Sequence, residues 1–233
     1  MQIKESPSGS LEMAAKEFCD LMSEKSRVTL SHFGISGSLL LGLATDASDV
    51  DVVVYGKQES LRAYDAIAEL RKQGHRLAPY DGKMISRIVQ QRWGDTGIDL
   101  SSLIDLERSK LLHGMFDSRE YFLRLVRDSP TRAESDAFFR PLGTAVIRGV
   151  VTDDSDSMFT PCRYGLEESR TLLGVPGPVI ELFSYRGKFT EHVRRGQLIE
   201  ARGKLENVKL DEESYMRIIL GGPRDYLIPK DGK

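Results

Sequence analysis

Two carboxylates stand two residues apart in the segment Asp49-Val-Asp51, which runs on into a series of valines. In a β-strand, side chains at i and i+2 point to the same face, roughly 6–7 Å apart along the chain. Asp49 and Asp51 therefore project together, while Val50 and Val52 face the other side and are available for a core. Paired carboxylates suit a hard cation such as Mg²⁺ or Mn²⁺, and a pair of such ions can clamp both oxygens of a phosphoryl displacement.

A Gly37-Ser38 pair lies upstream, and ten residues separate Ser38 from Asp49. A glycine lets the backbone approach a ligand closely, and the apolar stretch Leu39 to Leu43 predicts a short turn of helix after it. Exposed N–H groups at a helix N-terminus attract phosphate. The pattern therefore combines a phosphate-binding turn with a metal-binding strand.

The segments GSLLLG (residues 37–42) and SDVD (residues 48–51) closely resemble the signature of the DNA polymerase β nucleotidyltransferase superfamily. That signature is a Gly-Ser pair, a gap of the length seen here, and an acid–hydrophobic–acid strand. The resemblance covers residues 28–56 directly, and the order of helices and strands extends it to residue 127. In a wider sense the chain is similar to predicted archaeal-type nucleotidyltransferases with an appended β domain.

In that family the paired acids bind two metal ions, and Gly-Ser contacts the phosphates of a nucleoside triphosphate. The resemblance implies that Asp49 and Asp51 are catalytic metal ligands and that Gly37 and Ser38 bind the nucleotide. The implied cofactor is Mg²⁺ or Mn²⁺, and the implied partner is a nucleoside triphosphate.

The sequence departs from the family pattern in its basic residues. Small family members often carry a basic residue soon after Gly-Ser, where this chain has three leucines. Other cationic side chains must then neutralise the phosphate charge, and the candidates are Arg62, Lys83 and Arg87.

The third carboxylate of the family is also unassigned. Asp99 is one candidate, although it stands where a helix N-cap is expected. If the later strand is Tyr121 to Val126, its central polar residue is Arg124, and Glu120 and Asp128 lie only at its ends.

The elements that position these residues follow from hydrophobic spacing. Apolar residues at helical spacing predict helices over 11–24, 58–73, 83–93 and 99–112. Segments rich in β-formers predict strands over 28–35 and 49–55, with a hairpin made by residues 115–116 and 121–126. Alternating helices and strands indicate an α/β (α+β) nucleotidyltransferase core with a mixed sheet, which we place at residues 1–130.

The amino-acid composition changes at residues 128–136, a polar stretch with a proline that suits a linker. Short β-like segments follow, at 143–152, 178–186, 197–206 and 214–220. They predict a small antiparallel β-barrel domain over residues 140–233, similar in a general way to oligonucleotide-binding barrels.

Basic and aromatic residues mix in the segment from Phe183 to Lys209, which holds seven Lys or Arg against three Glu. Such a mixture is typical of surfaces that bind single strands, and equally of a barrel wall with aromatics inward and cations outward. Both interpretations stay open.

Composition argues against several other classes of protein. The formal net charge of −2 predicts no global basic field, and Cys19 and Cys162 cannot build a disulfide framework or a four-thiolate zinc site. No apolar run reaches the roughly 20 residues that span a bilayer, and the N-terminus lacks a signal-peptide core. We expect a cytoplasmic protein without membrane partners.

The predicted function is metal-dependent transfer of a nucleoside monophosphate from a triphosphate to a hydroxyl. The acceptor is a nucleic acid, held by the β domain, or else a small molecule or a protein. The alternative is a catalytically degenerate scaffold that binds nucleotide, nucleic acid or a protein partner.

Overall fold

The structure is a computed structural model that describes residues 9–127 and 137–230. Its contacts divide the chain into two compact units, Met1–Ile85 with Arg108–Asp128 and Ser86–Glu107 with Ser129–Lys233. The predicted linker at 128–136 lies outside the described residues, and the domain limits 1–130 and 140–233 stay a prediction. Within the described ranges, no helix is both long and apolar enough to cross a membrane.

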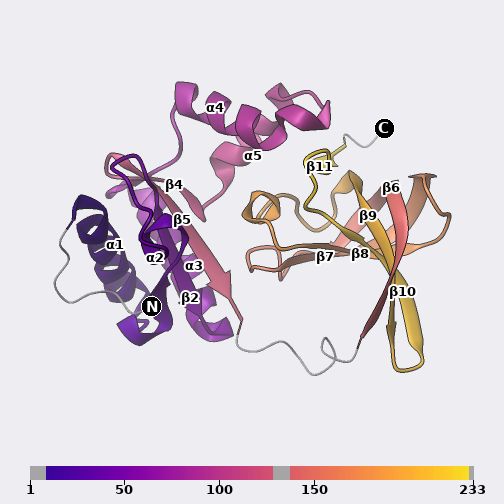
Figure 1. The fold of residues 1–233 in the computed structure, drawn as a ribbon, viewed down its shortest axis with the longest axis horizontal. Coiled ribbons are helices and arrows are strands. Elements are labelled where there is room, and N and C mark those ends of the chain that lie inside the picture. Colours follow the sequence, from indigo (N-terminus) through magenta and orange to yellow (C-terminus); the bar gives the residue numbers. More distant parts are fainter. Residues whose placement is uncertain (1–8, 128–136, 231–233) are drawn as a thin grey trace. The chain divides into compact units, whose positions relative to one another are not determined.

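The first unit is built on a five-stranded mixed sheet with the strand order β1-β2-β5-β4-β3 (Figure 1). Its elements are α1 (Ser10–Ser26), β1 (Phe33–Ile35), α2 (Gly37–Leu40), β2 (Val50–Tyr55), α3 (Lys57–Gln73), β3 (Leu77–Ala78), β4 (His113–Phe116) and β5 (Arg119–Val126). Strands β2 and β5 are parallel, whereas the other neighbours are antiparallel. The predicted α+β core with a mixed sheet is confirmed.

Alternation along β2 and β5 separates a core face from a polar face. Every second residue of each strand, Val50, Val52 and Val54 on one and Tyr121, Leu123 and Leu125 on the other, is buried. Helices α1 and α3 pack on each other and on β2. Burying this continuous apolar layer is the main stabilising term of the unit.

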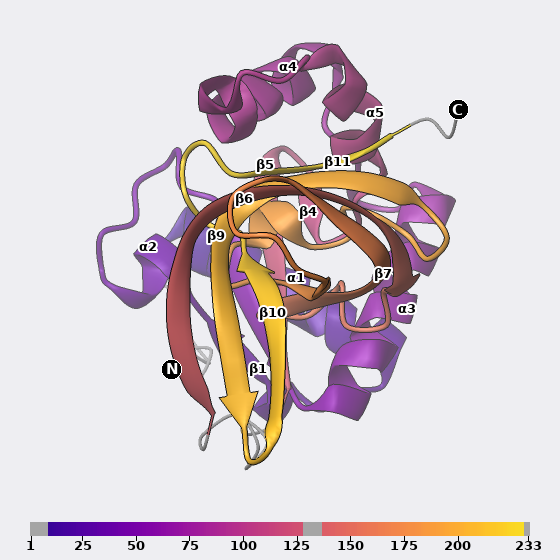
Figure 2. The same cartoon turned by 90° about the vertical axis from the view of Figure 1, so that its right-hand side faces the viewer.

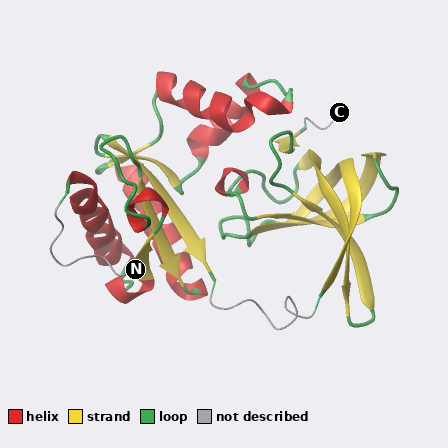
Figure 3. Cartoon of the chain, in the orientation of Figure 1, coloured by secondary structure: helices red, strands yellow, loops and turns green. Residues whose placement is uncertain are grey.

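The second unit combines a helix pair with a six-stranded sheet of order β10-β8-β7-β6-β9-β11 (Figure 2). Its elements are α4 (Gly82–Trp93) from Ser86 onward, α5 (Ser101–Ser109) up to Glu107, β6 (Phe138–Asp153), β7 (Cys162–Leu173), β8 (Val179–Ser184), β9 (Leu198–Leu210), β10 (Glu213–Ile219) and β11 (Tyr226–Pro229). From residue 137 onward the described chain is strand and loop apart from one short 3-10 turn (Figure 3).

The expectation of a wholly antiparallel second sheet is wrong for one pairing. Strand β10 runs parallel to β8, because two chain reversals, before and after β9, separate the two strands. The second sheet is therefore mixed, like the first. Strand β10 also pairs with β9, so that the pairings of β6, β7, β8, β10 and β9 form a continuous circuit.

Trp93 ties the helix pair to the second sheet. Its fully buried ring packs edge-on against Phe189 at 5.3 Å, and the Lys188 ammonium lies 4.6 Å from its centroid. The indole N–H donates to Glu107 at 3.0 Å, and the Arg92 guanidinium donates to the same carboxylate at 2.6 Å. A buried aromatic with its polar edge satisfied explains why this helical segment groups with the β-rich half of the chain.

Candidate active site

Strands β2 and β5 place a small set of polar side chains on the sheet face opposite α1 and α3. Asp51 lies beside Phe122, and Val53 lies beside Arg124. Side chains in register on parallel neighbours share a face, and they alternate along each strand. Asp51, Phe122 and Arg124 therefore stand on one face, and all three are half-buried.

Gly37 lies directly against Asp51. It adopts a left-handed conformation with φ of 59°, and a Cβ built on it would overlap the Asp51 carboxylate. The Ser36 N–H donates to the Asp51 carbonyl at 3.0 Å, just beyond the β1–β2 pairing. Only glycine fits both the backbone angle and the space, so the two halves of the sequence motif meet in the fold.

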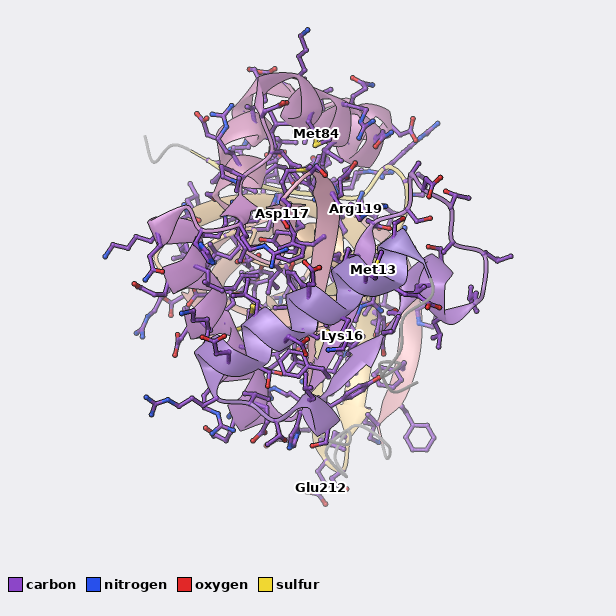
Figure 4. All side chains as sticks on the ribbon, turned by 90° about the vertical axis from the view of Figure 1, so that its left-hand side faces the viewer. Met13, Lys16, Met84, Asp117, Arg119 and Glu212 are labelled. Atoms are coloured by element: carbon purple, nitrogen blue, oxygen red, sulfur yellow. The ribbon has the colours of Figure 1, made fainter. Side chains whose placement is uncertain are left out.

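Asp49 is exposed and precedes β2, at the end of a loop that Arg119 holds in place. The Arg119 Nη1 donates to the carbonyls of Asp46 at 2.8 Å and Ser48 at 3.1 Å. Figure 4 labels Arg119 close to Asp117 of the β4–β5 turn. No local pattern predicts this contact, because an arginine after a hairpin turn is normally a solvated residue.

The electrostatics of Asp51 favour a bound cation. Burial, and secondarily the nearby charge of Asp49, raise the pKa of the Asp51 carboxyl from 3.8 to about 6, while Arg124 opposes the rise. A carboxyl with a raised pKa is destabilised in its charged form. A metal ion would relieve that cost.

Several polar atoms of this face lack hydrogen-bond partners. The Ser38 Oγ and the Arg124 Nε are buried, and neither makes a hydrogen bond within the described part of the chain. In the same ranges no hydrogen bond or ion pair is formed by the carboxylates of Asp49 and Asp51. We call the set Ser38, Asp49, Asp51 and Arg124 the β2–β5 site.

The donor set fits a Mg²⁺ ion that arrives with a nucleotide. Residues 9–127 and 137–230 contain no group of three or more His, Cys, Asp or Glu side chains placed to hold a metal. Mg²⁺ is usually bound by one or two carboxylates plus substrate phosphates and water. Asp49 and Asp51 can supply the two protein ligands of such an ion.

Asp99 lies two residues before the first residue of α5, next to the N-cap position that the sequence predicts for it. Its Oδ1 accepts a hydrogen bond from the Ser101 N–H at 3.0 Å, at the start of α5. Hydrogen bonds from Ser101 lower the pKa of the Asp99 carboxyl. The expectation that β5 carries Arg124, and no acid, at its central polar position is also confirmed.

Glu120 is the acid of β5 that comes nearest to the pair in register. It precedes Tyr121, the partner of Val50, and by alternation it shares a face with Phe122. Asp128 lies outside the described residues.

Among the candidate phosphate-binding cations, Arg62 has a local partner. Its guanidinium donates to Glu59 at 2.9 Å on the surface of α3. The roles of Lys83 and Arg87 on α4 stay predictions.

Comparison with known proteins agrees with this geometry. Residues 13–82 match the family model of the nucleotidyltransferase domain. The chain is 29% identical over 209 residues to "Uncharacterized protein MJ1086" of Methanocaldococcus jannaschii, covering 88% of this chain and 59% of that protein. This chain thus spans less than two thirds of the relative's length, and no solved structure matches it significantly. Residues 13–82, which contain Gly37, Ser38, Asp49 and Asp51, therefore carry a nucleotidyltransferase domain of the DNA polymerase β type.

Proposed function

We propose that the protein transfers a nucleoside monophosphate from a triphosphate to a hydroxyl acceptor, with Asp49 and Asp51 as ligands of Mg²⁺ or Mn²⁺. The observation that carries the proposal is the contact between Gly37 and the Asp51 carboxylate. It joins the phosphate-binding turn to the metal-binding strand. The raised pKa of Asp51 is a second support, because partial burial beside the Asp49 charge disfavours the charged form of Asp51 unless a cation is bound.

Each residue of the site has a distinct task in this proposal. Asp49 and Asp51 would hold the metal ion, which would supply charge neutralisation at the phosphates. Gly37 admits the phosphates close to the backbone, and Ser38 offers a hydroxyl. Arg119 fixes the loop before Asp49 and acts through position alone. Catalysis then rests on positioning rather than on a covalent intermediate.

The test is pyrophosphate release from each of the four nucleoside triphosphates, with hydroxyl acceptors from nucleic acids, small molecules and proteins. Asp51→Asn should abolish Mg²⁺-dependent release while its circular dichroism stays unchanged. Undiminished turnover in this variant would overturn the assignment.

A second candidate is a degenerate scaffold that binds nucleotide or a partner without turnover. The absence of a third metal-binding carboxylate among the described residues favours it. Glu120→Gln separates the two: loss of turnover with retained binding makes Glu120 the third acid. Binding without turnover in the wild type, across all acceptors, supports the scaffold.

For the second unit we propose a nucleic-acid partner bound on an oligonucleotide-binding type of barrel. The circuit β6-β7-β8-β10-β9 contains five strands, the number in that fold, and this supports the proposal. Tyr185 is 66% exposed and packs edge-on against Phe183 at 4.9 Å, which suits stacking on an unpaired base.

The measurement is fluorescence anisotropy with a labelled single-stranded oligonucleotide. Tyr185→Ala should weaken binding about tenfold, from the loss of one stacking contact. Leu173→Ala, an exposed apolar residue of β7, is the matched control. Equal affinity of the wild type and Tyr185→Ala would remove Tyr185 from the proposal.

A further inference from the structure

Arg124 occupies an unusual environment for an arginine. It stands at the centre of β5, half-buried, and its guanidinium lies 5.5 Å from the centroid of the Phe122 ring. Its Nε is buried without a hydrogen-bond partner. Although it shares a face with Asp51, it forms no ion pair with that carboxylate or with any other described residue.

A guanidinium presents five N–H donors in a rigid fork and accepts no hydrogen bonds. Buried donors without partners are costly, so an arginine normally folds onto a nearby carboxylate. Contrast Arg217 of β10, which donates to Glu206 at 2.7 Å and to Glu181 at 3.3 Å. Arg124 instead keeps its donors available on the face of Asp51, whose carboxylate also forms no hydrogen bond or ion pair within the described residues.

Such a fork matches the oxygens of a phosphate, to which arginine binds with two parallel hydrogen bonds. We propose that Arg124 binds the phosphates of the nucleotide in the β2–β5 site. This inference rests on the proposed function and adds to it the residue that meets the phosphate charge. It accounts for the leucines that follow Ser38, because the cation comes from the neighbouring strand and not from the turn.

The buried Ser38 Oγ supports the same ligand. This hydroxyl is a second polar atom without a partner, on the turn whose glycine touches Asp51. A metal-bound polyphosphate would satisfy the carboxylates through the cation, and the hydroxyl and guanidinium through its oxygens. A neutral ligand would leave the Arg124 charge unmet.

The experiment is a calorimetric titration with the Mg²⁺ complexes of ATP, GTP, CTP and UTP, and with AMP, at pH 6 and pH 8. The variants are Arg124→Gln, Arg124→Lys, Asp51→Asn and the control Arg148→Gln, which removes an arginine already paired with Glu200. Arg124→Gln should weaken ATP binding about 10- to 100-fold at both pH values, with a much smaller effect on AMP. The ATP affinity of Arg124→Lys should lie between those of the wild type and Arg124→Gln, since lysine keeps the charge but loses the guanidinium fork.

Three outcomes overturn the inference. Wild-type ATP affinity in Arg124→Gln, alongside a loss in Asp51→Asn, rejects Arg124 and leaves the proposed function standing. Recovery of Arg124→Gln at pH 8 would mean that Arg124 acts only by keeping Asp51 ionised. Failure of the folded wild type to bind any triphosphate rejects both the inference and the proposed function. Melting curves of Arg124→Gln and Arg124→Lys establish that each variant is folded.

Discussion

Two groups of charged side chains, one on each sheet, differ in how completely their members bond to one another. In the second sheet, the members of an arginine–glutamate cluster pair with one another. They are Arg163, Glu181, Glu206 and Arg217. Arg217 bonds to both glutamates, Arg163 lies 3.6 Å from Glu181, and both guanidinium groups lie within 5.2 Å of the centroid of the Phe183 ring. In the first sheet, the β2–β5 site leaves its hydroxyl, carboxylates and guanidinium without partners among the described residues.

This difference distinguishes a group of charges that stabilises the fold from a group that is available to bind a ligand. Buried polar groups in folded proteins are nearly always hydrogen-bonded, and exceptions call for an explanation. The arginine–glutamate cluster needs none, because its two positive and two negative charges balance and Arg217 hydrogen-bonds to both glutamates. The β2–β5 site holds both signs of charge without pairing them, as a site for a metal-bound anion would.

The largest effect should follow from removing a metal ligand. Asp49→Asn and Asp51→Asn should each weaken Mg²⁺-triphosphate binding by at least about 100-fold. Mutating even an outer-shell partner of a metal ligand typically lowers metal affinity about 10- to 100-fold. Calorimetric titration of the folded variants measures this. A matched exposed change, Asp46→Asn, should leave the affinity as it is. If Asp51→Asn binds the Mg²⁺-triphosphate as tightly as the wild type, the unpaired groups of the β2–β5 site do not mark it as a ligand site.

Breaking the arginine–glutamate cluster should affect stability and spare nucleotide binding. Arg217→Met leaves two glutamates without their main partner, which should lower the free energy of unfolding by about 3–5 kcal/mol. Arg148→Met removes an exposed partner of Glu200, paired at 2.9 Å, and should cost no more than about 1 kcal/mol. Urea denaturation compares them. Equal costs would mean that the buried cluster is no more important than a surface pair.

Gly37 and Gly42 form a natural pair for testing the turn. Both have positive φ, 59° and 67°, but only a Cβ at Gly37 meets the Asp51 carboxylate. Each alanine variant should lose about 1–2 kcal/mol from backbone strain. Only Gly37→Ala should also lose Mg²⁺-triphosphate binding in titration. Parallel loss of binding in Gly42→Ala would show that strain in the loop, and not contact with Asp51, is what matters.

The smallest predicted effect is a pH dependence of stability. The raised pKa of Asp51 means that between pH about 4 and about 6 the native protein holds a proton that the unfolded chain has released. This group therefore makes the metal-free protein less stable as the pH rises through that window. Asp51→Asn should raise the melting temperature at pH 7 and leave it nearly unchanged at pH 4. A variant that melts below the wild type at pH 7 would contradict the raised pKa.

The elements nearest the motif were predictable because local signals agree there. The spacing of apolar residues, with Gly74 as a left-handed cap, marks α3 over Lys57–Gln73 within one residue of its predicted limits. The valine run marks β2. By contrast β1 covers only Phe33–Ile35, since Leu30–His32 forms a 3-10 turn in which the Thr29 and Ser31 hydroxyls hydrogen-bond.

What the sequence could not predict depends on partners far along the chain. Strand β7, Cys162–Leu173, carries charged residues without a clean alternation, and it forms because β6 and β8 pair with it on either side. The register of β5 on β2 pairs Arg124 with Val53 and so places it on the face of Asp51, more than seventy residues away along the chain. No local pattern encodes that neighbour, so Arg124 could be identified from the sequence as a strand residue but not as a phosphate ligand.

The most direct test of the central claim is calorimetric binding of ATP, GTP, CTP and UTP to the wild-type protein, with Mg²⁺ and with the metal chelated. We predict that at least one triphosphate binds with Mg²⁺ and that its binding is lost on chelation, because the Asp49–Asp51 pair repels an unaccompanied anion. Tight binding that ignores the metal, or no binding of any triphosphate by the folded protein, would contradict the assignment of the β2–β5 site.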